Sequence, residues 1–435
     1  MSFQAIVGFI MVLALVFCLI KKKLLPPVAF IIFPVIAALV CGFGIVEIGE
    51  FAKTGIAGMV STVSLFVFSI SFFSLMSDAG IFDVVVNKLT SVAGTNVTAI
   101  MIATALIAVV GHLDGSGATT YIITTTAMLP IFKRMGLDKR ALMLITSLAI
   151  GVMNLVPWGG PTMRAATVLE MSPSDLWHPL ILIQALMLIF LLVVAFLQGK
   201  VLVRKKTDLA NREPAISEKE EVQDTGFDKS SKWKLIVNYV LTIGVIALLV
   251  LDKLPSAFVF MLGLAVGLIV NIPDMKMQNK KLKEYGTAAM SMVVTLFAAG
   301  IFTGVLKNTG ILDSMAATIV AIIPAALGPY THFIIAICAV PLIMCLGTDA
   351  FYYGLLPVVI GVCANFGVEA EVVARTLLIA ENVGVTISPL TPAVFLGLGV
   401  LDLDIGEHIK YSLPWVWAVS ILSVVIAVVI GVIPL

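Results

Sequence analysis

Apolar segments long enough to cross a bilayer recur along the whole of this 435-residue chain. A transmembrane helix needs about 20 predominantly apolar residues, and only helices or closed barrels satisfy all their backbone hydrogen bonds inside lipid. Charged residues make up 12% of the chain, which is about half the fraction in a soluble domain. The sequence therefore predicts an all-α polytopic protein embedded in a lipid membrane.

The uneven distribution of positive charge predicts how the chain crosses the membrane. Six connectors hold 22 of the 27 lysines and arginines, and they lie at 21–26, 77–96, 133–140, 200–234, 273–286 and 401–410. The positive-inside rule places these connectors in the cytoplasm. The segment 97–132 then enters and leaves on one side, either as a re-entrant hairpin or as two full spans joined by a turn, and 331–365 does so from the opposite side. This count gives about ten spans and two hairpins.

The two halves of the chain carry matching motifs in the same order. The matched residues are Gly80 with Gly310, Asp114 with Asp349, and Pro161 with Pro392, at offsets of 230, 235 and 231 residues. The charges orient the halves oppositely, and such an inverted repeat is the signature of many secondary transporters. The predicted parts are a first half at 1–199 with a hairpin at 97–132 and a broken helix at 141–170, a cytoplasmic linker at 200–234, and a second half at 235–435 with a hairpin at 331–365 and a broken helix at 373–400.

The hairpin tips and the broken helices offer groups that bind an anion. Helix N-termini expose unpaired N–H groups and a partial positive charge, and glycine lets the backbone approach a ligand closely. Arg164 is a fixed cation near membrane depth and needs an anionic partner, for which we expect a carboxylate substrate; the alternatives are an interfacial position or a pair with Glu170. The candidate substrate-binding residues are Gly115, Ser116, Gly117, Thr119, Asn154, Gly159, Thr162, Arg164, Thr348, Ser388 and Thr391.

Three acidic residues lie in or beside the same breaks. An intramembrane carboxylate can carry a proton, bind Na⁺ or ligate a divalent metal. Asp114 and Asp349 are therefore candidates for both metal binding and proton coupling, and Glu381 is a candidate for proton coupling. The simpler alternatives are that each aspartate caps a half-helix and that Glu381 pairs with Arg375. His112 is either a proton relay beside Asp114 or a structural histidine.

Several classes of protein are not expected. The chain has no P-loop motif that would bind ATP and no nucleophile elbow of a hydrolase, so we expect a transporter driven by an ion gradient and not an enzyme. Its five cysteines form no CxxC pair, and no residues at metal-ligand spacing indicate a prosthetic group. No basic stripe indicates a nucleic-acid partner.

Four segments resemble one known family. They are Leu113–Thr120, Gly151–Thr162 together with Arg164, Phe297–Gly304 and Asp349–Tyr352, and they are similar to the CitMHS family of bacterial citrate–divalent-metal:proton symporters, within the ion transporter superfamily. The resemblance covers essentially the full chain. It implies a multi-pass protein of the bacterial cytoplasmic membrane that takes up citrate with Mg²⁺ or Ca²⁺ as co-substrate, driven by protons. It also implies a homodimer, with a static scaffold and a transport domain that moves like an elevator.

The chain departs from the family pattern at three places. Gly347-Thr348-Asp349 stands where Ser-Asn-Asp is usual, Ser116 stands where a second aspartate is usual, and the stretch Glu381–Val385 lacks the usual proline and histidine. Fewer acids at the tips predict weaker metal ligation. A related di- or tricarboxylate as the substrate, a metal-free Na⁺-coupled carboxylate symporter and a cation/proton antiporter with no organic substrate are therefore the alternatives. A passive anion channel is a further one, which acidic tips disfavour.

Overall fold

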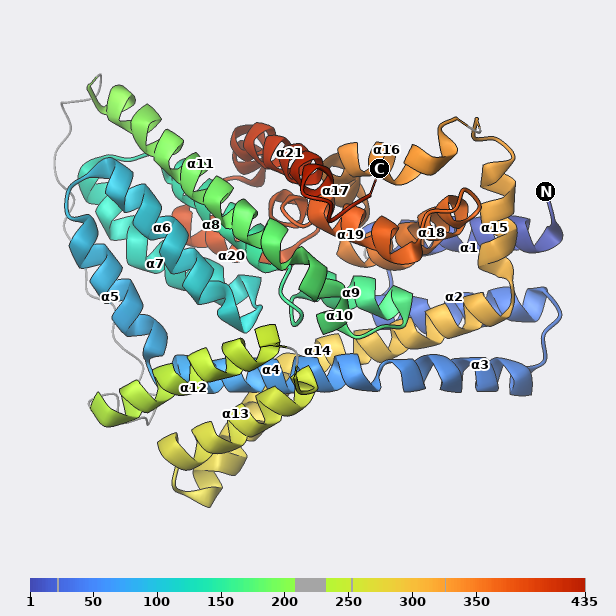
Figure 1. Cartoon of the computed structure of the whole chain (residues 1–435), viewed down its shortest axis with the longest axis horizontal. Coiled ribbons are helices and arrows are strands. Elements are labelled where there is room, and N and C mark those ends of the chain that lie inside the picture. The colour runs from blue at the N-terminus through green and yellow to red at the C-terminus, as the bar shows by residue number, and fades with distance from the viewer. Residues whose placement is uncertain (22, 208–231, 252, 325, 435) are drawn as a thin grey trace.

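Helices are the regular secondary structure of the computed structural model across the residues that it describes, which are 1–21, 23–207, 232–251, 253–324 and 326–434. Most of the segment expected to be a linker at 200–234 lies outside these ranges. Its first residues extend helix α11 (Ile181–Thr207) and its last residues begin α12 (Lys232–Leu251). The helices pack in two groups, which Figure 1 shows below and above one another.

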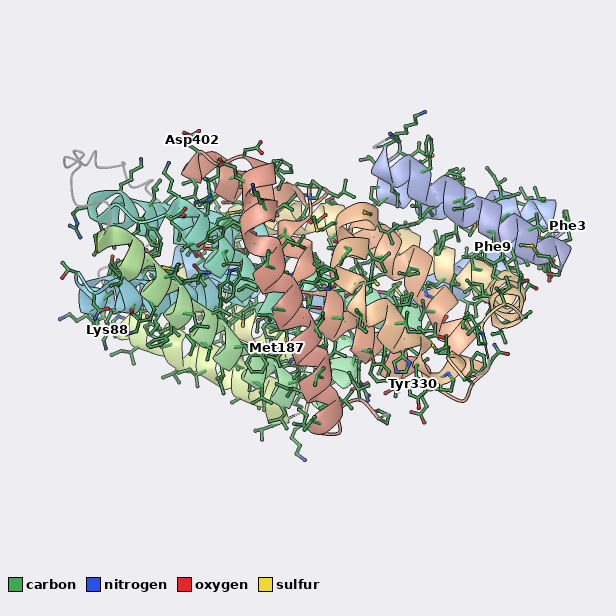
Figure 2. The ribbon with its side chains drawn as sticks, turned by 90° about the horizontal axis from the view of Figure 1, so that it is seen from above. Phe3, Phe9, Lys88, Met187, Tyr330 and Asp402 are labelled. Atoms are coloured by element: carbon green, nitrogen blue, oxygen red, sulfur yellow. The ribbon has the colours of Figure 1, made fainter. Side chains whose placement is uncertain are left out.

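The first group contains the 34-residue helix α14 (Met275–Asn308), and we call it the α14 layer. Its other members are α2 (Pro26–Val40), α3 (Ile45–Gly58), α4 (Val60–Asp78), α12 and α13 (Ser256–Asn271). Helices α1 (Phe3–Ile20) and α15 (Ile311–Val320) pack on each other beside this layer. Figure 2 shows Phe3 and Phe9 of α1 at the end of the long axis opposite to Lys88 of α5.

The second group contains both segments predicted to be hairpins, and we call it the hairpin layer. Its members from the first half are α5 (Ile81–Ala93), α6 (Val97–Gly111), α7 (Gly117–Met135), α8 (Lys139–Met153), α9 (Gly160–Leu169), α10 (Pro173–Trp177) and α11. Its members from the second half are α16 (Thr331–Ile337), α17 (Ala339–Asp349), α18 (Leu356–Ala364), α19 (Ala370–Glu381), α20 (Pro392–Leu401) and α21 (Ile405–Val429).

Helices α8 and α19 form the centre of the hairpin layer. Every residue of α8 from Ala141 to Met153 is buried, and most of α19 is buried as well. One continuous apolar core surrounds them and draws on both halves of the chain, from Ala93 to Leu202 and from Ala336 to Ile433. Because α8 has no face left for lipid, neighbouring helices from both halves must cover it.

Helix lengths modify the count of membrane spans. Among the described residues, seven helices are long and apolar enough to cross a membrane, and an eighth is obtained when α19 and α20, which are bent by 42° at their break, are counted as one span. Four other apolar helices have only 10–17 residues. The sequence-based count of about ten spans was higher because an apolar run does not show where its helix ends. In α2, for example, Pro26 begins the helix and it ends before Gly42, whose φ is 95°.

Both broken helices and both tips depart from regular helix where the sequence carries proline or glycine. The chain leaves α8 at Asn154 and resumes as α9 with Pro161 in its first turn. It leaves α19 after Glu381, passes through a short 3₁₀ helix and resumes with Pro392 as the first residue of α20. The first tip is a 3₁₀ turn between α6 and α7, which contact each other. At the second tip, Gly347 interrupts α17 with φ 73° and ψ 165°, a conformation that favours glycine.

Candidate functional site

An ion pair joins the first broken helix to the second tip. Nε of Arg164, in the first turns of α9, donates a hydrogen bond to Oδ1 of Asp349 at 2.7 Å. The two side chains are 11% and 21% exposed, so the pair is largely withdrawn from solvent. The alternative partner Glu170 instead accepts a hydrogen bond from Nζ of Lys307 at 2.7 Å. The sequence thus indicated that Arg164 needs an anion, and the structure supplies one from the other half of the chain.

A buried carboxyl group lies close to this ion pair. Glu381, at the end of α19, is fully buried, and its Oε2 accepts a hydrogen bond from the hydroxyl of Tyr352 at 2.7 Å. No described residue donates to its Oε1, and the adjacent Asn382 amide likewise lacks a described partner. Tyr352 follows Asp349 by three residues, and helix α9, which carries Arg164, contacts α19. Arg375, the alternative partner, binds Glu371 one turn before it in α19.

Asp114 holds the first tip in its turn. Its Oδ1 accepts a hydrogen bond from the backbone N–H of Ser116 at 2.8 Å, across Gly115 with φ 71°. The hydroxyl oxygen of Ser116 then caps α7 by accepting from the backbone N–H of Thr119 at 3.3 Å. Ser116, and not Asp114, is therefore the N-cap residue, while Asp114 supports the turn before it. Ser116, Gly117 and Thr119 remain partly exposed.

The first tip and the first broken helix are bonded to each other. His112 is fully buried, with Nδ1 2.8 Å from Oγ1 of Thr120 and Nε2 3.0 Å from Oδ1 of Asn154. Nε1 of Trp158 donates to the carbonyl oxygen of Leu113 at 2.8 Å. Both ring nitrogens of His112 are thus engaged, one by the first tip and one by the end of α8.

Other predicted substrate ligands bind the backbone of the breaks. The buried hydroxyl of Thr162 lies 3.0 Å from the carbonyl oxygens of Asn154 and Leu155, at the end of α8. The hydroxyl of Thr391 donates to the carbonyl oxygen of Val385 at 2.8 Å, and Oγ of Ser388 accepts from the backbone N–H of Leu390 at 3.2 Å. These side chains satisfy backbone groups that an interrupted helix leaves unpaired. Gly159 also faces backbone, since a Cβ there would lie 2.1 Å from the carbonyl oxygen of Asn154.

The second broken helix contacts both tips and the first broken helix. A Cβ on Gly117 would lie 3.4 Å from the Cβ of Ala393, and a Cβ on Gly347 would lie 3.4 Å from Cδ1 of Leu390. A Cβ on Gly151 of α8 would lie only 2.6 Å from the Cα of Val383. All four breaks are therefore linked at the centre of the hairpin layer. Asp114 and Asp349 belong to different contacts in this arrangement, because the first supports its own tip and the second binds Arg164.

Tyr352 and Asn382 are additions that the sequence reasoning did not select. Each lies next to a selected position, because Tyr352 follows Asp349 by three residues and Asn382 follows Glu381 directly. Their roles depend on the contact between α19 and the π-helical turn at Ala350–Leu355, where the hydroxyl of Tyr352 donates to Glu381. A buried acid followed by an amide in an apolar run is the only signal in the sequence that could have pointed to Asn382.

An all-helical membrane protein in which interrupted helices meet around buried charges has the architecture of a membrane transporter. The fold is similar to the crystal structure of the YdaH transporter of Alcanivorax borkumensis, with a TM-score of 0.62 over 90% of this chain and 91% of that one, at 16% sequence identity. The sequence model of the citrate transporter family, CitMHS, matches residues 15–380, and the chain belongs to this family. The resemblance stated from the sequence is thereby confirmed.

Two relatives from Bacillus subtilis (strain 168) match along nearly their whole length. One is named a citrate transporter and is 34% identical over 429 residues, which is 99% of both chains. The other is named a Mg(2+)/citrate complex secondary transporter and is 32% identical over 428 residues, which is 98% of both chains. Both relatives are named transporters, the class of protein that the sequence analysis expected of this chain.

Proposed function

We propose that this protein imports citrate, or a related di- or tricarboxylate, as a complex with Mg²⁺ or Ca²⁺ by proton symport across the bacterial cytoplasmic membrane. The observation that carries the proposal is the largely buried ion pair of Arg164 and Asp349, in which a guanidinium that can bind a carboxylate lies next to a carboxylate that can bind a metal. Citrate³⁻ with a divalent cation keeps one net negative charge, so its two ends match these two side chains. The names of the two relatives support the same cargo.

The proposed substrate site lies between the two tips and the two broken helices. Arg164 binds a substrate carboxylate, while Asp349 and Asp114 are the proposed ligands of the metal. The partly exposed tip residues contribute hydroxyl and N–H groups to the substrate, and they are Gly115, Ser116, Gly117, Thr119 and Thr348. The other candidates shape the breaks that carry these groups, and they are the buried Asn154, Gly159, Thr162 and Ser388 and the partly exposed Thr391.

Glu381 is the proposed site of the coupled proton. It is fully buried, its Oε1 has no described partner, and Tyr352 connects it to the segment that carries Asp349. Ionisable residues buried at membrane depth serve as proton relays in transporters. Asp114 and Asp349 stay candidates for the same role, because they lie at the proposed substrate site.

We further propose that the hairpin layer is the moving transport domain and that the α14 layer is the scaffold of a homodimer. The hairpin layer has its own core, which both halves of the chain build together. A separate cluster of aromatic rings joins the layers, with Trp158 5.4 Å from Phe73 and 5.1 Å from Phe260 between ring centroids. Tyr353 and Met163 of the hairpin layer also pack against the α14 layer, so the proposed movement requires these contacts to slide.

Uptake of labelled citrate into proteoliposomes tests the function. The assay compares Mg²⁺, Ca²⁺, Na⁺ and no added metal, each with and without an inward proton gradient. We expect uptake that requires a divalent metal and that the proton gradient accelerates. Metal-independent uptake driven by Na⁺ would instead identify a Na⁺-coupled carboxylate symporter, and proton-driven metal flux without citrate would identify a cation/proton antiporter.

A further inference from the structure

Arg164 and Asp349 neutralise each other where the two halves meet. The contact uses one atom of each side chain, Nε and Oδ1 at 2.7 Å, so the two Nη groups of Arg164 and Oδ2 of Asp349 lie outside it. The side chains are partly accessible, at 11% and 21% exposure. A largely buried ion pair that loses one partner leaves a charge without compensation, which is strongly unfavourable. Any ligand that binds one member of this pair must therefore also bring a charge that compensates the other member.

We propose that the substrate binds by exchanging partners with this ion pair, an inference that rests on the transport of a metal–carboxylate complex proposed above. A carboxylate of the complex replaces Asp349 on Arg164, and Asp349 moves to the divalent cation of the complex. Before the exchange, Arg164 is paired with Asp349 and the metal is paired with the substrate. Afterwards each protein charge has a partner of opposite sign from the complex, and no charge is left alone.

The exchange explains how the site selects the complex over its two components. A free carboxylate that takes Arg164 leaves Asp349 without a cation, next to new negative charge. A free divalent cation that takes Asp349 leaves Arg164 without an anion, next to new positive charge. While Asp349 stays ionised, only a ligand with both charges compensates both side chains, so the ion pair itself provides the metal requirement.

Asp349 is suited to a metal that arrives with its own ligands. Mg²⁺ and Ca²⁺ take six or more oxygen ligands, of which one carboxylate supplies one or two, and the carboxylates and hydroxyl of citrate supply others. Across the ranges that the structure describes, no group of three or more His, Cys, Asp or Glu side chains could hold a metal ion. Asp349 follows the sharp turn at Gly347 by two residues, so its position depends on the tip and not on a long rigid helix.

The test measures binding of labelled citrate to the purified full-length protein by equilibrium dialysis, with excess Mg²⁺ or with a chelator. We expect the unmodified protein to bind the complex at least about tenfold more tightly than free citrate. Asp349→Asn keeps the shape of the side chain and removes its charge, which leaves Arg164 free for a carboxylate. In this variant the preference for the complex should fall to within about twofold or reverse.

Arg164→Gln provides an independent readout, because it releases Asp349 for a cation. We expect it to bind Mn²⁺ alone more tightly than the unmodified protein does, as measured by electron paramagnetic resonance, and this result decides the question if Asp349→Asn does not fold. Glu170→Gln is the matched control, because it removes one member of the more exposed ion pair with Lys307, and it should leave both measurements unchanged.

The outcomes separate this inference from the function on which it rests. If Asp349→Asn keeps the full preference for the complex, or if Arg164→Gln gains no affinity for Mn²⁺, partner exchange is wrong while metal–citrate transport stands. If the unmodified protein binds neither citrate nor its metal complex, the proposed function itself fails.

Discussion

Replacing Gly151 with alanine tests whether the two broken helices must touch backbone to backbone. Gly151 lies in the fully buried part of α8, and an added Cβ would lie 2.6 Å from the Cα of Val383 and 3.1 Å from the carbonyl oxygen of Asn382. A contact below 3.0 Å is one that real Cβ atoms essentially never show. Because both opposing atoms belong to the backbone, a change of side-chain rotamer cannot relieve the overlap, and the second break must move.

The size of the effect follows from packing. Adding a methyl group to a well-packed interior costs about 1–3 kcal/mol, whereas exchanging glycine for alanine in an unobstructed helix stabilises by up to about 1 kcal/mol. Gly244 in α12 is the matched control, since nothing lies within 4 Å of a Cβ added there. We expect Gly151→Ala to be less stable than Gly244→Ala by about 1–3 kcal/mol.

The assay combines unfolding in mixed detergent micelles, followed by tryptophan fluorescence, with citrate uptake into proteoliposomes. Uptake by Gly151→Ala should fall well below that of Gly244→Ala, because Val383 lies two residues after Glu381 and moves with it. Equal stability and equal uptake of the two variants would refute the close crossing of the broken helices.

Three further changes test single contacts. Arg164→Ala should abolish citrate uptake, whereas Lys307→Ala, which removes a more exposed cation, should leave uptake within about twofold; equal effects would remove Arg164 from the site. Glu381→Gln should abolish acceleration of uptake by a proton gradient while citrate exchange at equal pH persists, and a gradient response like that of the unmodified protein would exclude Glu381. Trp158→Phe should lower stability by about 1 kcal/mol in the unfolding assay, since the carbonyl of Leu113 loses its donor; unchanged stability would contradict this.

Composition and the length of the apolar segments sufficed to predict the helical membrane fold, because apolar length and charge are properties of single segments. Pairing between distant segments was harder to predict. Arg164 was known to need an anion, yet Glu170 was the near candidate in sequence and Asp349 lies 185 residues away. Which acid pairs with Arg164 depends on how α9 packs against the second tip, and no local sequence pattern specifies that packing.

The sequence also did not show which groups the hydroxyl side chains near the breaks bind. Thr162 was selected as a substrate ligand because it begins a half-helix, but its hydroxyl faces the end of α8. The sequence did not show that the two ring nitrogens of His112 bind Thr120 and Asn154. A polar side chain near a break has backbone groups as competing partners, and only the folded geometry decides between them.

The burial of α8 has a consequence for the order in which the chain is made. The segment Ala141–Met153 emerges from the ribosome long before α21, yet α21 contacts α8 in the finished protein. Domains generally fold as units during synthesis, and the side of α8 that α21 covers stays open until α21 has been added. Nascent chains that stop short of Ile405 should therefore expose α8 to lipid and be targets for membrane proteases.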